Sequence, residues 1–373
     1  MAIGKLEEAS SFLKDNFLYI FLKNNNWYNN SDMNESIKVA VAGATGYVGL
    51  ELIKILSKHP RVKIAYLFAR KNIGKSISTF DKRIKSKNLP KISKLKNIKW
   101  NDIKILFTAL PNGEAQKLAK KMPTHVSLID LSADFRIKNP NLYKKWYGIN
   151  HSCKQLLNKS LYAVTEFSKE KLNNHRIISC PGCYPTSIQL PLIPLLEKKM
   201  IKANNIIVDS KSGYSGAGKK IKRKFSFKNM FNSVSAYGIG SHRHMAEIDQ
   251  ELSKAAKKSI KIFFTPHLIP MFRGILSTIY VECLKNYDAK KLYYFLKNYH
   301  KKNHFVKIAK FNSSIGTGEV LDTNYCKISI CNDRKKGRVI IISTIDNLLK
   351  GASGQAVQNM NVASNFNESM GLK

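Results

Sequence analysis

Residues 37–49 read IKVAVAGATGYVG, and this stretch decides the fold of the chain. Its first six residues are mostly small or β-branched, as is typical of a buried parallel strand. Three glycines follow, at Gly43, Gly46 and Gly49, and apolar residues then recur at helical spacing until Pro60. A glycine loop between a strand and a helix lets backbone N–H groups approach a pyrophosphate at the helix N-terminus. The stretch therefore predicts a dinucleotide-binding unit, and a tight turn without a ligand is the alternative.

The next strand indicates which nucleotide such a loop would hold. Residues 62–69 form the expected strand, which runs into Arg70 and Lys71, and no Asp or Glu lies between Lys54 and Thr79. A site for NAD usually has an acidic residue there for the ribose 2′-hydroxyl, whereas cations pair with a 2′-phosphate. The sequence therefore predicts NADP(H). The expected contacts on these elements are Gly43, Thr45, Gly46, Tyr47, Val48, Arg70 and Lys71.

The remaining pattern predicts an α/β fold with two domains. Strands expected at 62–69, 103–110 and 126–131 alternate with helices, which is typical of a doubly wound parallel sheet of the Rossmann type. The second half is richer in strands, expected at 206–210, 260–265, 275–282, 326–331 and 339–343, with a long helix at 289–301. We expect a nucleotide-binding domain at 37–182, a mixed α/β domain at 183–345, and a closing helix at 346–366 that returns to the first domain. Residues 1–36 are expected to be an N-terminal extension, either frayed or a docking helix.

Composition narrows the classes of function. The formal net charge of +38 first suggests a nucleic-acid partner, but ten of the 63 basic residues are arginines, and nucleic-acid surfaces favour arginine with interleaved aromatics. We expect the lysine excess to form a solvated surface that attracts small anions, with no nucleic acid bound. Six cysteines are too few for a disulfide scaffold, and no apolar run of about 20 residues could span a membrane. The sequence lacks secretory features, so a cytoplasmic protein is expected.

Cys183 marks the expected catalytic centre, in the stretch CPGCYPT at 180–186. It follows a short expected strand at 176–180 and precedes an apolar helical stretch. Backbone amides and the helix dipole lower the pKa of a thiol at such a helix start, so it can act as a thiolate nucleophile. The C-x-x-C spacing of Cys180 and Cys183 is also that of a thiol–disulfide pair. A buried structural cysteine is the third interpretation, and it fits Cys180 better.

The stretch GIGSHRHMAE at 238–247 offers a proton partner for that thiol. If a helix begins near Ser241, His242 and His244 point to different faces, so one of them would meet Cys183. His244 and Glu247 are three residues apart and share a face, which predicts a base with its own orienting carboxylate. We therefore expect His244 to be the acid/base, with His242 in reserve, and two surface histidines are the alternative. Other ligands at zinc spacing are missing nearby, so no metal is expected.

These stretches together resemble the N-acetyl-gamma-glutamyl-phosphate reductases of the semialdehyde dehydrogenase family, from about residue 37 to the C-terminus. Further matching motifs are ALPNG at 109–113, DLSADFR at 130–136, KSG at 211–213, SGAG at 215–218, TPHLIPM at 265–271 and DNLLKGA at 346–352. The resemblance implies NADPH-dependent reduction of an acyl phosphate to a semialdehyde in arginine biosynthesis, with release of phosphate. It also implies a second domain of the semialdehyde dehydrogenase type for catalysis and dimerisation, in a homo-oligomer (dimer or tetramer).

The resemblance also implies roles for single residues. Cys183 falls on the nucleophile position, and the family usually has Asn where this chain has Cys180. Further cofactor positions are Pro111, Ser215, Gly216, Asn347 and Gln355. Expected substrate contacts are Arg136, Arg243 and Ser132, because guanidinium groups bind phosphate and carboxylate bidentately. Ordinary ion pairs are the alternative for both arginines. The same chemistry on aspartyl phosphate or carrier-linked α-aminoadipyl phosphate is the alternative for the substrate.

Overall fold

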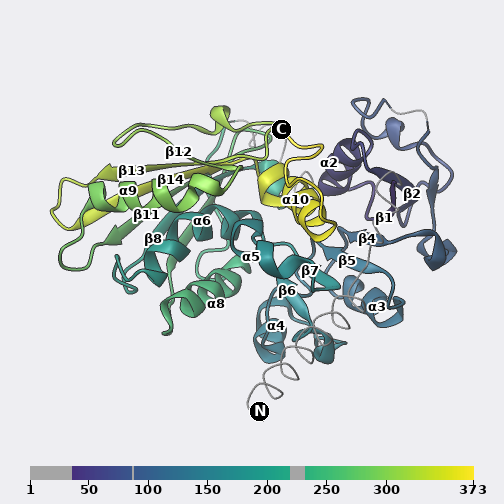
Figure 1. The fold of residues 1–373 in the computed structure, drawn as a ribbon, viewed down its shortest axis with the longest axis horizontal. Coiled ribbons are helices and arrows are strands. Elements are labelled where there is room, and N and C mark those ends of the chain that lie inside the picture. The colour runs from purple at the N-terminus through teal and green to yellow at the C-terminus, as the bar shows by residue number, and fades with distance from the viewer. Residues whose placement is uncertain (1–35, 86–87, 219–231) are drawn as a thin grey trace, which may run out of the picture. The chain divides into compact units, whose positions relative to one another are not determined.

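The computed structural model describes residues 36–85, 88–218 and 232–373, and the predicted extension lies outside them apart from Ser36. Residues 37–373 form one compact unit that contains two seven-stranded sheets (Figure 1). The division into domains at residue 182 stays a prediction. In the part of the chain that is described, no helix combines the length and the apolar character needed to cross a membrane.

The first sheet is parallel throughout and has the order β3-β2-β1-β4-β5-β7-β6. Its strands are β1 (Ile37–Ala42), β2 (Val62–Phe68), β3 (Ile92–Ser93), β4 (Ile105–Thr108), β5 (Ser127–Asp130), β6 (Ser160–Tyr162) and β7 (Ile177–Ser179). Its helices are α2 (Tyr47–Leu56), α3 (Glu114–Lys121), α4 (Pro140–Tyr147) and α5 (Thr165–Leu172). This confirms the predicted doubly wound sheet. Strand β1 lies between β2 and the central strand β4, and the glycine loop joins β1 to α2.

The second sheet is mixed and has the order β12-β13-β14-β11-β8-β10-β9. Its strands are β8 (Ile207–Gly213), β9 (Ser235–Ala236), β10 (Phe263–Ile269), β11 (Ile275–Glu282), β12 (Val306–Ile308), β13 (Cys326–Asn332) and β14 (Arg338–Ile345). The helices α6 (Cys183–Glu197) and α9 (Ala289–Tyr299) pack on this sheet, and α8 (His244–Ala256) packs on α6. Helix α6 lies at the centre of the largest apolar core, because all but two of its residues are buried.

The predicted closing helix is divided. A π-helical turn (Leu349–Ser353) precedes α10 (Gly354–Ala363), and α10 packs against α2 and α5 beside the first sheet. The apolar side chains Ala356, Val357 and Met360 join the core that α2 forms with that sheet. Single-turn π-helices frequently occur at functional sites. The C-terminal segment therefore links the second sheet, through β14, to the nucleotide-binding side of the molecule.

Two glycines of the loop are required by backbone packing. Gly43 has a φ of +93°, and a Cβ placed on it would lie 2.3 Å from the carbonyl oxygen of Ala109. A Cβ on Gly49 would lie 2.2 Å from the carbonyl oxygen of Gly43. A Cβ on Gly46 would meet its nearest atom at an ordinary 3.5 Å. Gly43 and Gly49 thus let the loop fold tightly between β1, β4 and α2.

Candidate active site

Cys183 is the first residue of α6 and is only partly exposed. Gly182 precedes it in extended conformation, and a Cβ on Gly182 would lie 2.4 Å from Nε2 of His244. On the other side, a Cβ on Gly351 of the π-helical turn would lie 2.7 Å from Cβ of Cys183. The turn that carries the thiol is therefore packed between an imidazole and the closing segment, with no room for a further methyl group on either side.

The pKa of Cys183 differs from the sequence expectation. Burial raises the pKa of this thiol to about 11, although the N–H groups of Tyr184 and of Cys183 itself and the charge of Arg136 lower it. The predicted effect of the helix N-terminus is present, but desolvation of the thiolate outweighs it. The expectation of a lowered pKa is therefore wrong for the protein without ligands, and the thiol needs a base to become a nucleophile.

His244 provides a neutral imidazole that packs against Gly182, the residue before Cys183. Burial lowers the pKa of His244 well below its ordinary value, and the neighbouring His242, Arg136 and Arg243 lower it further. Among the described residues its Nδ1 is buried without a hydrogen-bond partner, while its Nε2 is the atom that faces Gly182. The lone pair of a neutral imidazole is free to accept a proton, but the lowered pKa of His244 and the raised pKa of Cys183 both favour the uncharged pair in the protein without ligands.

His242 lies just before α8 and positions His244. Its Nδ1 accepts a hydrogen bond from the backbone N–H of His244 at 3.2 Å, and the two rings are 4.9 Å apart. Its ring also packs edge-on against Tyr184, Tyr237 and Phe264. The expectation that the two histidines point apart is wrong, because the helix begins at His244 and not near Ser241. Burial lowers the pKa of His242 to about 4.

Glu247 does not orient His244, so that part of the prediction is wrong. One of its carboxylate oxygens accepts hydrogen bonds from the N–H of Gly182 and the hydroxyl of Tyr162, both at 2.7 Å. The other oxygen lies 3.4 Å from Nη1 of Arg136. The carboxylate thus contacts Tyr162 of β6 and holds the turn that precedes Cys183. The position of Cys183, and not the tautomer of His244, depends on it.

The three predicted substrate contacts have different surroundings. Arg136 is buried, and it donates to the carbonyl oxygens of Cys180 at 2.8 Å and Leu131 at 3.0 Å. The hydroxyl of Ser132 donates to Asp130 at 2.8 Å and accepts the N–H of Asp134 at 3.2 Å. The hydroxyl of Ser132 therefore bonds within its own loop, and its expected contact with the substrate stays a prediction.

Arg243 is an exposed cation that lies between the two histidines in sequence. Its guanidinium lies 5.6 Å from the centre of the Tyr147 ring. Within the described residues it forms no ion pair. An exposed guanidinium at the start of α8 can bind a carboxylate or a phosphate bidentately. Of the predicted substrate contacts, it is the one whose surroundings suit direct binding best.

The glycine loop has the features of a pyrophosphate site. Gly46 caps α2 without a side-chain hydrogen bond, and the first turn of α2 contains no acidic residue. No carboxylate in the first turn of α2 therefore neutralises the positive end of the helix dipole. Arg70 and Lys71 follow β2 and are exposed, and Arg70 lies 3.2 Å from Glu114. An exposed pair of this kind is weak in water, so it leaves Arg70 available to a 2′-phosphate.

The remaining predicted cofactor residues lie on loops beside the closing segment. Asn347 donates to the hydroxyl of Ser215 at 3.0 Å and accepts the N–H of Gly274 at 2.7 Å. A Cβ on Gly216 would lie 3.6 Å from the same Asn347 side chain, so these three residues form one cluster. Pro111 lies apart from it, exposed after β4.

Gln355 offers the clearest indication of a missing partner. Its Nε2 donates to Thr165 at 2.5 Å, while its Oε1 is buried and has no hydrogen-bond partner in the described part of the chain. A buried acceptor without a donor is costly. An amide donor from a bound nicotinamide cofactor would satisfy it, so the residues present fit NADP(H).

Sequence reasoning missed two buried ion-pair groups that support the site. Arg273 binds Glu51 of α2 at 2.5 Å and also reaches Asp322 and Asp346, at 2.6 and 3.1 Å. It thereby ties the helix after the glycine loop to the residue before Asn347. The other group is the fully buried pair of Lys350 with Glu166, at 2.7 Å. The one signal in the sequence was Glu51 itself, an acid within an otherwise apolar helical face.

Comparison with known proteins agrees with this architecture. Family models described as the NAD binding domain and the dimerisation domain of semialdehyde dehydrogenases match residues 38–175 and 183–347. The chain therefore belongs to the semialdehyde dehydrogenase family.

Individual relatives are more specific. The chain is 41% identical over 339 residues to a probable chloroplastic N-acetyl-gamma-glutamyl-phosphate reductase of Oryza sativa, covering 91% of this chain and 82% of the relative. It is 42% identical to the N-acetyl-gamma-glutamyl-phosphate reductase of Afipia carboxidovorans, over 91% of this chain and 98% of the relative. The structure of aspartate semialdehyde dehydrogenase II from Vibrio cholerae has the same fold, with a TM-score of 0.68 at 18% identity, over 89% of this chain and 99% of that one.

Proposed function

We propose that this chain reduces N-acetyl-gamma-glutamyl phosphate with NADPH, forming N-acetyl-glutamate 5-semialdehyde and inorganic phosphate, a step of arginine biosynthesis. The observation that carries the proposal is the identity of 40–42% over 91% of the chain with proteins named as this reductase. The placement of Cys183 at the start of α6, directly after the Gly182 that packs on His244, supports it, because a thiol at that position can form the covalent intermediate that the reaction needs.

The mechanism begins with proton transfer from the Cys183 thiol to Nε2 of His244. The thiolate forms a bond to the γ-carbonyl carbon, the bond from that carbon to the phosphate oxygen breaks, and phosphate leaves with the electron pair and takes up one proton from solvent. A thioester on Cys183 remains. NADPH, when bound, supplies the hydride that converts this thioester into a thiohemiacetal, whose oxygen takes the proton held by His244. His244 then removes that hydroxyl proton as the carbon–sulfur bond breaks, which releases the aldehyde and returns the thiolate.

Other residues hold these groups in place. Glu247 fixes Gly182 and so the approach of the sulfur, and the charge of Arg136 stabilises the thiolate. Arg243 is our choice for binding an anionic group of the substrate. Gly43, Thr45, Gly46, Tyr47 and Val48 would hold the pyrophosphate, Arg70 and Lys71 the 2′-phosphate, and Gln355 with the Asn347 cluster the nicotinamide end.

The test is turnover of the purified chain in the reverse direction, from N-acetyl-glutamate 5-semialdehyde, phosphate and NADP+, followed by NADPH absorbance. Cys183→Ser should abolish turnover, and Cys180→Ser should largely preserve it because the Cys180 thiol is buried against Asn359. Equal loss in both variants would favour a redox pair instead. Faster turnover of the aspartate or α-aminoadipate semialdehyde would contradict the proposed substrate.

We further propose that the protein is a cytoplasmic homo-oligomer, dimer or tetramer. The family model of its second half is a dimerisation domain. Alternate residues of β11 and β14 leave a half-buried apolar set facing away from α6, formed by Leu276, Tyr280, Ile340 and Ile342. Burying such a face against a second copy is favourable in proportion to its apolar area. Light scattering after gel filtration tests this, and a monomer at micromolar concentration would refute it.

A further inference from the structure

A groove with a strongly cationic lining lies away from the catalytic cysteine. It has a volume of about 880 Å³ and is lined by α5, the end of α9, the 3-10 turn His300–Lys302, β12 and the segment after α10. Among its 14 lining residues are five lysines, Lys169, Lys297, Lys301, Lys302 and Lys307, against one acid. We refer to it as the cationic groove.

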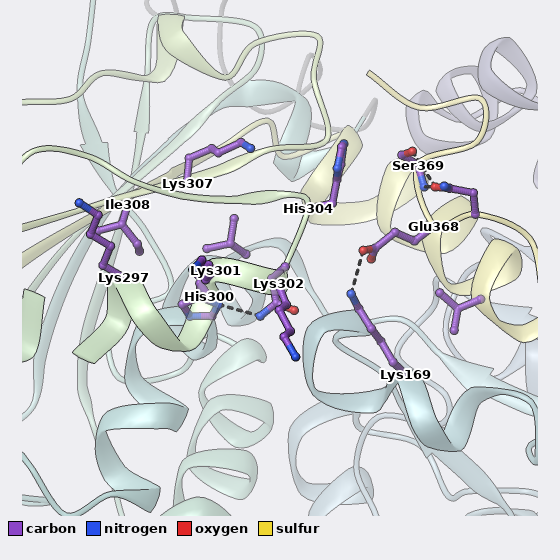
Figure 2. A pocket seen from close by; sticks show the side chains of 14 residues that line it. Lys169, Lys297, His300, Lys301, Lys302, His304, Lys307, Ile308, Glu368 and Ser369 are labelled. Atoms are coloured by element: carbon purple, nitrogen blue, oxygen red, sulfur yellow. Dashed lines mark hydrogen bonds and ion pairs between the residues drawn. The ribbon is translucent and has the colours of Figure 1, made fainter. Parts of the chain in front are cut away.

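The one acid of the groove does not neutralise these lysines. Glu368 binds Lys169 at 2.8 Å through one oxygen and accepts the Gln358 amide at 3.1 Å through the other. Figure 2 shows this pair on one side of the groove, with Lys297, Lys301 and Lys302 on the other side. In the described part of the chain no carboxylate pairs with any of those three lysines. The opposite wall therefore carries uncompensated positive charge.

The floor of the groove is rigid. His300 is buried, its Nε2 lies 3.0 Å from the carbonyl oxygen of Leu190, and its Nδ1 lies 3.0 Å from the amide nitrogen of Asn303. These contacts hold the turn that carries Lys301 and Lys302. Lys301 and Lys302 are thus two exposed cations carried on a turn that is tied to the protein, and a bound anion would reduce the local excess of positive charge.

The composition of the lining indicates the kind of ligand. Ammonium groups act as point charges and bind phosphate or carboxylate oxygens without the planar geometry that arginine requires, and the lining contains no arginine. Cations on both walls favour a molecule with several separated charges. The volume falls within the range of small-molecule sites, about 300–1,000 Å³.

We propose that the cationic groove is a binding site for a small anion that carries three or more negative charges. It lies outside the catalytic machinery, so the proposal does not depend on the function proposed above. Lys301 and Lys302 are the pair to test, because they are adjacent and lack a carboxylate partner in the described part of the chain, whereas Lys169 is paired with Glu368.

The test is calorimetric titration of the full chain at fixed low ionic strength with inorganic tripolyphosphate and, separately, with citrate. The variant Lys301→Ala/Lys302→Ala should weaken binding of the tighter anion by about tenfold or more, because each lysine that is removed takes away a charge-assisted contact with the anion. The matched control is Lys120→Ala/Lys121→Ala, which removes two adjacent exposed lysines from the end of α3 and should leave affinity unchanged.

Each outcome decides the proposal. The tighter of the two anions identifies the ligand chemistry as phosphate or carboxylate. Absence of binding by both anions overturns the site. Binding that the Lys301/Lys302 variant leaves intact places the anion elsewhere, for example at the glycine loop, and also overturns it. Equal weakening of anion binding in both double variants would show that the net charge of the protein alone attracts the anion, which also overturns the site. Thermal unfolding of each variant confirms that it is folded.

Discussion

Substituting Gly351 by alanine tests the packing around the nucleophile. A Cβ at this position would lie 2.7 Å from Cβ, and 3.2 Å from Cα, of Cys183. Carbon atoms prefer separations of about 3.5–4.0 Å, so the two chain segments must move apart by roughly 1 Å. Overpacking of this kind costs about 1–3 kcal/mol of stability, and a displacement of about 1 Å at a catalytic group can lower turnover by about 100-fold.

The prediction is tested by three measurements on Gly351→Ala: turnover, thermal unfolding and the rate of Cys183 alkylation by iodoacetamide. We expect a large loss of turnover with a modest loss of stability, because relieving the contact displaces the turn that carries the thiol relative to the closing segment. Gly318→Ala is the matched control, since a Cβ there meets nothing within 4 Å and no positive φ is required. Turnover and alkylation at wild-type rates in Gly351→Ala would refute the reasoning.

Two further predictions concern buried charge. Lys350→Met leaves Glu166 buried without its cation, and breaking a buried pair costs about 3–5 kcal/mol, which urea unfolding measures. The double variant with Glu166→Gln should recover most of that loss, and a loss below about 1 kcal/mol in the single variant would contradict it. The second prediction concerns pH: because burial raises the pKa of Cys183 to about 11, its alkylation in the free protein should accelerate steadily as pH rises toward that value. A plateau reached below pH 8 would show a lowered pKa instead.

Local sequence signals were sufficient for β1, the glycine loop, α2 and most of the longer strands, but they did not predict the short strands β3, β6, β9 and β12 or the helices α4 and α5. Residues 37–49 predicted the strand, the loop and the start of α2, because burial pattern and glycine position act over a few residues. The stretch around Cys183 likewise predicted a strand followed by a helix, and α6 does begin at Cys183. Arg70 at the end of β2 was found from the same local order.

Long-range contacts decided the rest. The raised pKa of Cys183 and the partners of Glu247 depend on how α8 packs against the turn before α6, 65 positions away in sequence. Arg273 and Glu51 are separated by 222 positions, and Lys350 and Glu166 by 184. Hydrophobic periodicity and motif spacing indicate which face of a segment is buried, but they carry no information about which distant charged side chain meets it. The doubly wound sheet and the preference for NADP(H) were therefore readable from the amino-acid order, and Cys183 as the nucleophile stays a prediction. The environment that sets the chemistry of that thiol exists only once the two sheets and the closing segment are packed together.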